Sequence, residues 1–186
     1  KGNAIYPDDL VKSFGVDAVR FFVLKEMPYA HDGVITYDLM IEHINTNLAN
    51  VYGNLVNRTI SMANQYLDGH IIAPTTVLPL DEELRSFTVE VIEKYDAKFN
   101  EYHVSEAISQ VIELLRRANK YIDETTPWVL AKDESQHERL NDVLYNLLEV
   151  IKKATVLLSP IIPDSSVKYL QSINAEAINF EDLVHH

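Results

Sequence analysis

The stretch DLMIEHINTNLANVYGNLVNRTISMANQYL, residues 38–67, places apolar side chains three and four residues apart, as on one face of an α-helix. We therefore predict one long helix over these residues, with Asp68 and Gly69 ending it. The apolar face of this helix is formed by Ile41, Ile44, Leu48, Val51, Leu55 and Met62.

Helical patterns also dominate the rest of the chain. Nothing after Tyr37 alternates like a strand, and the stretch IIAPTTVLPL, residues 71–80, has two prolines and no period, which indicates a connector. Long helices joined by short loops pack as antiparallel neighbours, so we predict a mainly α fold, an antiparallel bundle of about five helices. The predicted helices after the connector span residues 81–99, 104–123, 136–158 and 165–172.

The beginning of the chain has a different pattern, which we interpret as a small α/β segment. Residues 7–9, Pro-Asp-Asp, favour a helix start, and Gly15 ends that helix. We expect Asp17 to cap a second helix, DAVRFFVLKEM. The alternation in GVITY, residues 33–37, permits a short extended piece.

We divide the chain into two parts, the α/β segment over residues 1–35 and the helical bundle over residues 36–184. Because Lys1 is not an initiator methionine, we expect the chain to be part of a longer protein. The two last residues, His185 and His186, are interpreted as the remnant of a purification tag.

The composition excludes several classes of function. The absence of cysteine excludes disulfides, thiolate zinc sites and thiol nucleophiles. A net charge of −12 opposes nonspecific attraction to phosphate backbones, so any nucleic-acid contact has to be local and specific, and we expect no DNA partner. No apolar run approaches the roughly 18 residues that cross a bilayer, so we expect a soluble, cytoplasmic protein without a membrane partner.

The chain shows none of the common catalytic or nucleotide-binding motifs, and no catalytic residue is assigned. Its histidines are scattered, without the four-residue spacing that presents two imidazoles to one metal ion, so we expect no metal site. The acidic runs at residues 81–83 and 123–124 are interpreted as solvated surface. Core positions are expected for the aromatic residues Phe21, Phe22, Tyr95, Tyr102, Tyr121 and Tyr145.

The middle of the long helix is rich in poor helix formers, which points to a role beyond helix formation. Gly53 costs about 1 kcal/mol in a helix interior. Asn47, Asn54 and Arg58 share one flank of the apolar face, while Asn50, Asn57 and Asn64 point outward. One guanidinium among amides suits hydrogen bonding to base edges, and we expect Gly53 to keep the flank shallow enough for a base.

A structural explanation for the same residues stays open. Asn54 and Arg58 can satisfy main-chain carbonyls of a neighbouring loop, and Gly53 can let another helix approach closely. The stretch ETTPWVLAK, residues 124–132, leaves a similar choice. Thr126 can cap a short helix in which Trp128, the only tryptophan, either stacks on a base or forms a wedge between helices.

These residues carry a resemblance to the C-terminal part of methionyl-tRNA synthetase, a family of class I aminoacyl-tRNA synthetases. Residues 1–24 resemble the segment that follows the KMSKS signature in this class. Residues 32–58 are similar to the family's D-G-x-F-S segment and the following N-x-D-L-A-N-x-L-G-N-L-x-x-R. The chain departs from these motifs at Thr36, Thr46, Asn47 and Tyr52.

The resemblance implies roles for particular residues. The family's helical domain binds the CAU anticodon of methionine tRNA, and its principal anticodon-binding positions correspond to Asn54, Arg58 and Trp128. Residues 1–35 correspond to a stem-contact segment of the tRNA synthetase, with possible tRNA backbone contacts at Lys12, Arg20 and Lys25.

The resemblance also implies a parent enzyme, a methionine–tRNA ligase that charges tRNA with methionine using ATP. It places ATP with magnesium, and allows zinc, in a catalytic domain of the same polypeptide that these residues lack. The chain alone is therefore expected to be inactive and to bind tRNA weakly. Two alternatives stay open: the same region of a valine, leucine, isoleucine or cysteine enzyme, and a non-enzymatic helical protein-interaction domain.

Overall fold

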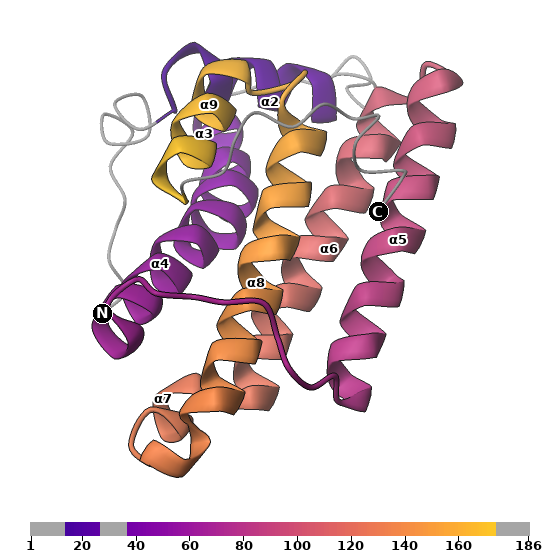
Figure 1. The fold of residues 1–186 in the computed structure, drawn as a ribbon. Coiled ribbons are helices and arrows are strands. Elements are labelled where there is room, and N and C mark those ends of the chain that lie inside the picture. Colours follow the sequence, from indigo (N-terminus) through magenta and orange to yellow (C-terminus); the bar gives the residue numbers. More distant parts are fainter. Residues whose placement is uncertain (1–13, 27–36, 174–186) are drawn as a thin grey trace.

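The computed structural model describes residues 14–26 and 37–173, and within these residues it contains helices and no strands. Figure 1 shows the long helices side by side, with shorter helices at the two ends of the bundle. The elements are α2 (Val16–Glu26), α3 (Tyr37–Ile44), the π-helix η2 (Asn45–Gly53), α4 (Asn54–Leu67), α5 (Pro79–Asn100), α6 (Val104–Thr125), α7 (Pro127–Leu130), the 3₁₀-helix η3 (Glu134–Gln136), α8 (His137–Leu158) and α9 (Pro163–Ser172).

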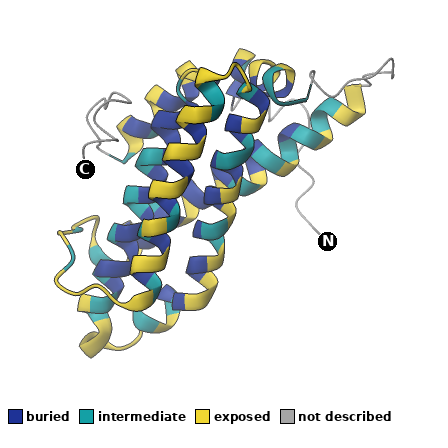
Figure 2. Ribbon diagram, turned by 90° about the vertical axis from the view of Figure 1, so that its right-hand side faces the viewer, coloured by how far each residue is buried: buried dark blue, intermediate teal, exposed yellow. Residues whose placement is uncertain are grey.

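The core lies between the long helices. α6 packs against α5 on one side and α8 on the other, and α4 packs against α8. Figure 2 shows buried residues on the facing sides of these helices and exposed residues on their outer sides. The predicted helices after the connector are confirmed, each to within a few residues at its ends.

The long helix predicted over residues 38–67 is confirmed in extent but changes its winding. Between Asn45 and Gly53 it is π-helical, and the main-chain N–H of Asn54 donates to the carbonyl of Ala49, five residues back. A π-helix has more residues per turn than an α-helix and therefore shifts the side chains that follow it around the axis. Tyr52, which is not among the residues of the predicted apolar face, is buried within this segment, and its hydroxyl lies 2.6 Å from Thr155 Oγ1.

Gly53 lies inside the fold rather than on an exposed flank. A Cβ atom at this position would lie 3.6 Å from Phe14 Cζ and 3.6 Å from the Tyr169 hydroxyl. The expectation that Gly53 keeps a base-binding flank shallow is therefore wrong. The alternative explanation, the close approach of another helix, describes its surroundings, since Tyr169 belongs to α9.

Asp17 caps a different helix from the one predicted. It lies in the first turn of α2, where it is buried, and its carboxylate accepts a hydrogen bond of 2.7 Å from the main-chain N–H of Ser165. Ser165 belongs to the first turn of α9, whose N–H groups have no partner within that helix. Asp17 therefore joins α2 to the C-terminal part of the bundle.

The connection between α4 and α5 follows the prediction. Asp68 ends α4 in the left-handed conformation, with φ 52°. The connector then crosses the bundle over α8, where Asn141 donates to the carbonyl of Ile72 and accepts from its N–H, both at 3.0 Å. One predicted core residue is wrong: Tyr102, in the turn between α5 and α6, is 90% exposed.

Several predictions lie outside the described residues. These are the helix start at residues 7–9, the division of the chain at residue 35, the tag remnant at residues 185–186, and the extended piece at residues 33–37 except for Tyr37. Tyr37 is the first residue of α3, so the extended conformation predicted for it is wrong.

Candidate functional site

The structure brings Arg58 and Trp128, two of the three predicted anticodon-binding residues, into contact. Arg58 and Asn54 lie four residues apart on α4, and both are exposed. The guanidinium carbon of Arg58 lies 5.3 Å from the centroid of the Trp128 ring, within the range of a cation–π interaction. Residues from distant parts of the sequence therefore meet on one surface formed by α4 and α7.

Trp128 reaches this surface through a strained turn. Thr126 adopts the left-handed conformation, with φ 45° and ψ 64°, which is unusual for a β-branched residue. Its carbonyl accepts from the N–H groups of Val129 and Leu130, whereas its side chain makes no capping hydrogen bond to α7, so the predicted cap is wrong. Pro127 is buried, and Trp128 is partly buried against the core, which leaves part of the indole accessible.

The π-helical segment before Asn54 is tied to the bundle by residues that the sequence interpretation missed. The side-chain amide of Asn119, on α6, donates to the carbonyl of Val51 at 3.2 Å. Asn47, predicted to share the flank with Asn54, donates instead to the carbonyl of His43 at 3.3 Å. No sequence spacing indicates the Asn119 contact, because it joins two helices far apart in the chain.

One carboxylate of the acidic run at residues 81–83 departs from the prediction of solvated surface, whereas Glu82 and Glu83 are exposed as predicted. Asp81 is completely buried and accepts hydrogen bonds from Tyr121 and Arg139. Burial alone would raise the pKa of Asp81, but the hydrogen bonds from Arg139 and Tyr121 outweigh it and hold the pKa below its ordinary value. Asp81 is therefore charged at neutral pH, and it serves the interior rather than the surface.

Arg20 and Lys25, two of the three residues predicted to contact the tRNA backbone, bind groups of the chain itself. Arg20 donates to the main-chain carbonyls of Ile161 and Pro160, at 3.1 and 3.0 Å, and so holds α2 to the turn between α8 and α9. Lys25 Nζ lies 3.4 Å from a carboxylate oxygen of Glu26. Lys12 lies outside the described residues.

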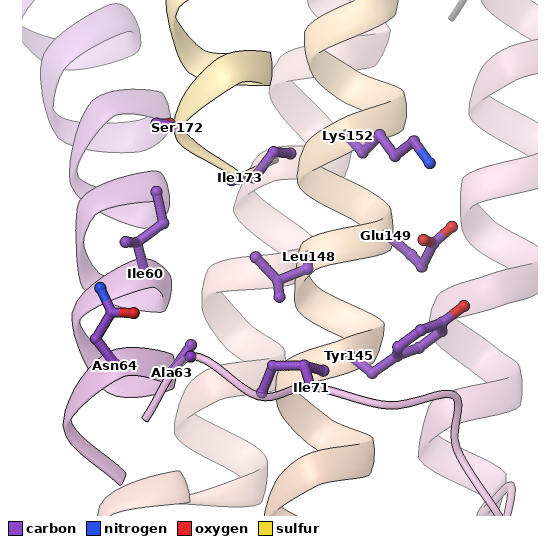
Figure 3. A pocket seen from close by; sticks show the side chains of 11 residues that line it. Ile60, Ala63, Asn64, Ile71, Tyr145, Leu148, Glu149, Lys152, Ser172 and Ile173 are labelled. Carbon is purple, nitrogen blue, oxygen red and sulfur yellow. The ribbon is translucent and has the colours of Figure 1, made fainter. Parts of the chain in front are cut away.

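A separate cavity of about 340 Å³ opens between α4, the connector, α8 and the end of α9 (Figure 3). Ile60 and Leu148 contribute apolar surface, and Tyr145, Glu149 and Lys152 of α8 contribute polar groups. Neither Arg58 nor Trp128 lines it. Over residues 14–26 and 37–173 there is no group of three or more potential metal-ligating side chains. The helices of the same residues include none that is both long and apolar enough to cross a membrane.

Comparison with known proteins shows which family the chain resembles. Residues 81–186 match the family model described as the anticodon-binding domain of tRNA ligase, and residues 1–60 match the model of class I (M) tRNA synthetases. A methionine–tRNA ligase of Clostridium perfringens is 44% identical over 98% of this chain, which spans 28% of that relative. One of Caldanaerobacter subterraneus is 42% identical over 93% of this chain and 27% of the relative.

The fold is also found in solved structures. The apo form of Mycobacterium tuberculosis methionyl-tRNA synthetase superimposes with a TM-score of 0.79 at 33% identity, covering 91% of this chain and 34% of that one. The resemblance to methionyl-tRNA synthetase is thus confirmed. Because the anticodon-binding model matches more than half of the residues, and because the described residues form the expected helical bundle, the chain belongs to the family of anticodon-binding domains of tRNA ligases.

Proposed function

We propose that this chain recognises the CAU anticodon of methionine tRNA through Asn54, Arg58 and Trp128, as the C-terminal part of a methionine–tRNA ligase. The observation that carries the proposal is the 5.3 Å contact between Arg58 and the Trp128 ring, with Asn54 exposed one helical turn away. Bases of single-stranded loops are recognised by stacking on aromatic faces and by hydrogen bonds to their edges. The three side chains supply both kinds of contact.

The contact between Arg58 and Trp128 suggests how a base enters. In the chain without RNA, the guanidinium covers part of the indole. A base that stacks on that face displaces Arg58, whose five N–H donors then become available to base edges and phosphates. Stacking on an aromatic side chain is worth about 1 to 3 kcal/mol per base, more than the about 0.5 to 1 kcal/mol of an exposed cation–π pair. The stacking contact is therefore at least as strong as the cation–π contact that it replaces.

The remaining tRNA contacts contribute less in this chain. The net charge of −12 opposes phosphate binding, so we expect weak binding by the chain alone. Arg20 and Lys25 already have local partners, and a phosphate has to compete with those partners. We keep Lys12, Arg20 and Lys25 as proposed backbone contacts of a stem-contact segment over residues 1–35, beside an anticodon-binding domain over residues 36–184.

The activity of the whole protein is part of the same proposal. The relatives named methionine–tRNA ligase are more than three times as long as the matched region, since the chain spans 28% of the Clostridium perfringens protein. We infer a cytoplasmic parent enzyme that charges tRNA with methionine using ATP and magnesium, with zinc allowed, in a catalytic domain of the same polypeptide. No residue of this chain is proposed to act in that chemistry, so the chain alone should not aminoacylate tRNA.

The intrinsic fluorescence of Trp128 tests the proposal, because it is the only tryptophan. The chain is titrated at low salt with an anticodon stem-loop carrying CAU and with one carrying a changed anticodon. We expect the CAU stem-loop to quench the emission at lower concentration. Equal responses to the two stem-loops, or no response to either at high concentration and low salt, would contradict anticodon recognition and favour a helical protein-interaction domain.

A further inference from the structure

Both ends of the segment that carries Trp128 bind one buried carboxylate. Asp81, in the first turn of α5, accepts a hydrogen bond of 2.6 Å from the Tyr121 hydroxyl. It also accepts two from the Arg139 guanidinium, at 2.6 and 2.9 Å. Tyr121 lies near the end of α6 and Arg139 in the first turn of α8. The chain between them contains α7 and Trp128.

The polar groups around this carboxylate are well satisfied. The main-chain N–H of Leu78 donates to Asp81 at 3.0 Å, and the Asn146 amide donates to the Tyr121 hydroxyl at 3.2 Å. Asp81 thus accepts four hydrogen bonds in a position from which water is excluded. Satisfied networks of this kind rigidify the elements that they join.

An ion-pair network nearer the surface joins the start of α5 to the end of α6. The guanidinium of Arg117, on α6, binds Glu83 of α5 at 3.0 Å and Glu124 of α6 at 2.7 Å. The start of α5 and the end of α6 are therefore held together both inside and at the surface of the bundle.

The segment between Tyr121 and Arg139 has little stability of its own. α7 has four residues, far fewer than an isolated helix needs. Thr126, which precedes it, is held in an unfavourable left-handed conformation. The hydroxyl of Thr125 donates to the Tyr121 carbonyl at 2.7 Å, which connects the strained turn directly to a residue that binds Asp81. The position of Trp128 therefore depends on the helix ends on either side of it.

We propose that Asp81, Tyr121 and Arg139, here called the Asp81 cluster, hold the Trp128 segment in place, so that the indole lies against Arg58. The three are positioning residues for the surface formed by Arg58 and Trp128. The consequence for RNA rests on the proposed anticodon function, whereas the position of Trp128 in the free chain does not.

Two matched substitutions test the proposal in the 186-residue chain. Tyr121→Phe removes the hydroxyl that binds Asp81, and Tyr95→Phe removes an equally buried hydroxyl that donates to Leu157 at 2.6 Å, near the other end of α8. The measurements are urea unfolding and acrylamide quenching of Trp128. We expect both variants to lose similar stability, but only Tyr121→Phe to raise the quenching constant, by about twofold, because losing one buried hydrogen bond shifts a local opening equilibrium several-fold.

An unchanged quenching constant in a folded Tyr121→Phe protein, or an equal rise in both variants, would overturn the proposal. If circular dichroism shows that Tyr121→Phe does not fold, Arg139→Lys takes its place. This change keeps the positive charge but removes the bidentate hydrogen bonding of the guanidinium to Asp81. We expect the same rise in the quenching constant of Trp128.

Stem-loop binding then separates this inference from the proposed function. We expect Tyr121→Phe to weaken binding of the CAU stem-loop by about fivefold, while Tyr95→Phe leaves it unchanged. A rise in quenching without loss of stem-loop affinity would overturn the positioning role for RNA. The third outcome is that Tyr121→Phe raises the quenching constant but the unsubstituted chain binds the CAU stem-loop and the changed stem-loop equally. This outcome supports the structural role of the Asp81 cluster and contradicts the anticodon function.

Discussion

The side-chain amide of Asn119 donates a hydrogen bond of 3.2 Å to the carbonyl of Val51, and so attaches α6 to the π-helical segment just before Asn54. The same amide also donates to the carbonyl of Leu115, at 3.1 Å. Asn119 therefore joins α6 to the part of the helix that directly precedes Asn54 and Arg58.

Asn119→Ala should lower the free energy of unfolding by about 1 to 2 kcal/mol, because a partly buried carbonyl loses its donor. Urea unfolding followed by circular dichroism measures the change. Asn100→Ala serves as the control, since the amide of Asn100 donates only to exposed Asp96 at the end of α5. Equal losses in the two variants would show that the Val51 contact contributes nothing specific.

Arg58→Ala should reduce the preference for CAU over a changed anticodon by about 1 to 3 kcal/mol if Arg58 contacts a base edge. In the free chain it should also uncover the indole and raise acrylamide quenching of Trp128. Fluorescence titration with both stem-loops measures the preference.

Lys94→Ala is the matched control for Arg58→Ala, because it removes an exposed positive charge from α5. It should leave the anticodon preference unchanged. A large loss of folding stability in Arg58→Ala, with the preference intact, would assign Arg58 a structural role instead.

The helices could be predicted because their apolar periodicity depends only on residues that are close together in the sequence. Ile44, Leu48, Leu55 and Met62 are buried as their spacing indicates. The π-helical winding between Asn45 and Gly53 could not be predicted from a fixed rotation per residue, although the asparagines and the glycine marked the place where α-helical propensity is poor.

The candidate site was predicted only in part for a similar reason. Arg58 and Trp128 could be singled out as unusual residues in their segments, but their contact depends on how α7 packs beside α4. Asp81 was misread because an acidic residue at a helix start is normally solvated. Its burial follows from Arg139 and Tyr121, which come from other helices and have no sequence relationship to it.

Gly53→Ala should leave anticodon binding unchanged and raise the free energy of unfolding by up to about 1 kcal/mol, because alanine is a better helix former. The added methyl group would meet its neighbours at 3.4 to 3.6 Å, which is ordinary van der Waals contact. Thermal unfolding and stem-loop titration measure the two effects. Loss of binding without loss of stability would restore the idea that Gly53 shapes the RNA-binding flank.

Thr126→Gly should stabilise the chain by about 1 kcal/mol, because glycine adopts positive φ values without strain. Thr125→Gly is the control: Thr125 is buried in the last turn of α6, so glycine there should lower the stability by about 1 kcal/mol or more. Denaturant unfolding compares the two variants. Destabilisation of similar size at both positions would mean that the left-handed turn at Thr126 carries no strain.

The charge of Asp81 should make the stability of the bundle depend on pH in the acid range. Its pKa in the folded chain lies below the ordinary value of 3.8, because hydrogen bonds from Arg139 and Tyr121 outweigh the effect of burial. A lowered pKa contributes stability that is fully present above the ordinary value and is lost as the pH falls through the folded value. Asp81→Asn should therefore cost about 3 to 5 kcal/mol at neutral pH, where Arg139 loses its charged partner, and progressively less below about pH 4.

Urea unfolding of both proteins between pH 7 and pH 2.5 measures this difference for Asp81→Asn. Asp133→Asn is the control at an exposed site. The pKa of Asp133 is also lowered, by hydrogen bonds from Ser135, but solvent screens its interactions, so its substitution should change stability little at any pH. A constant difference between wild type and Asp81→Asn across the whole range would show that the Asp81 carboxylate does not titrate with folding.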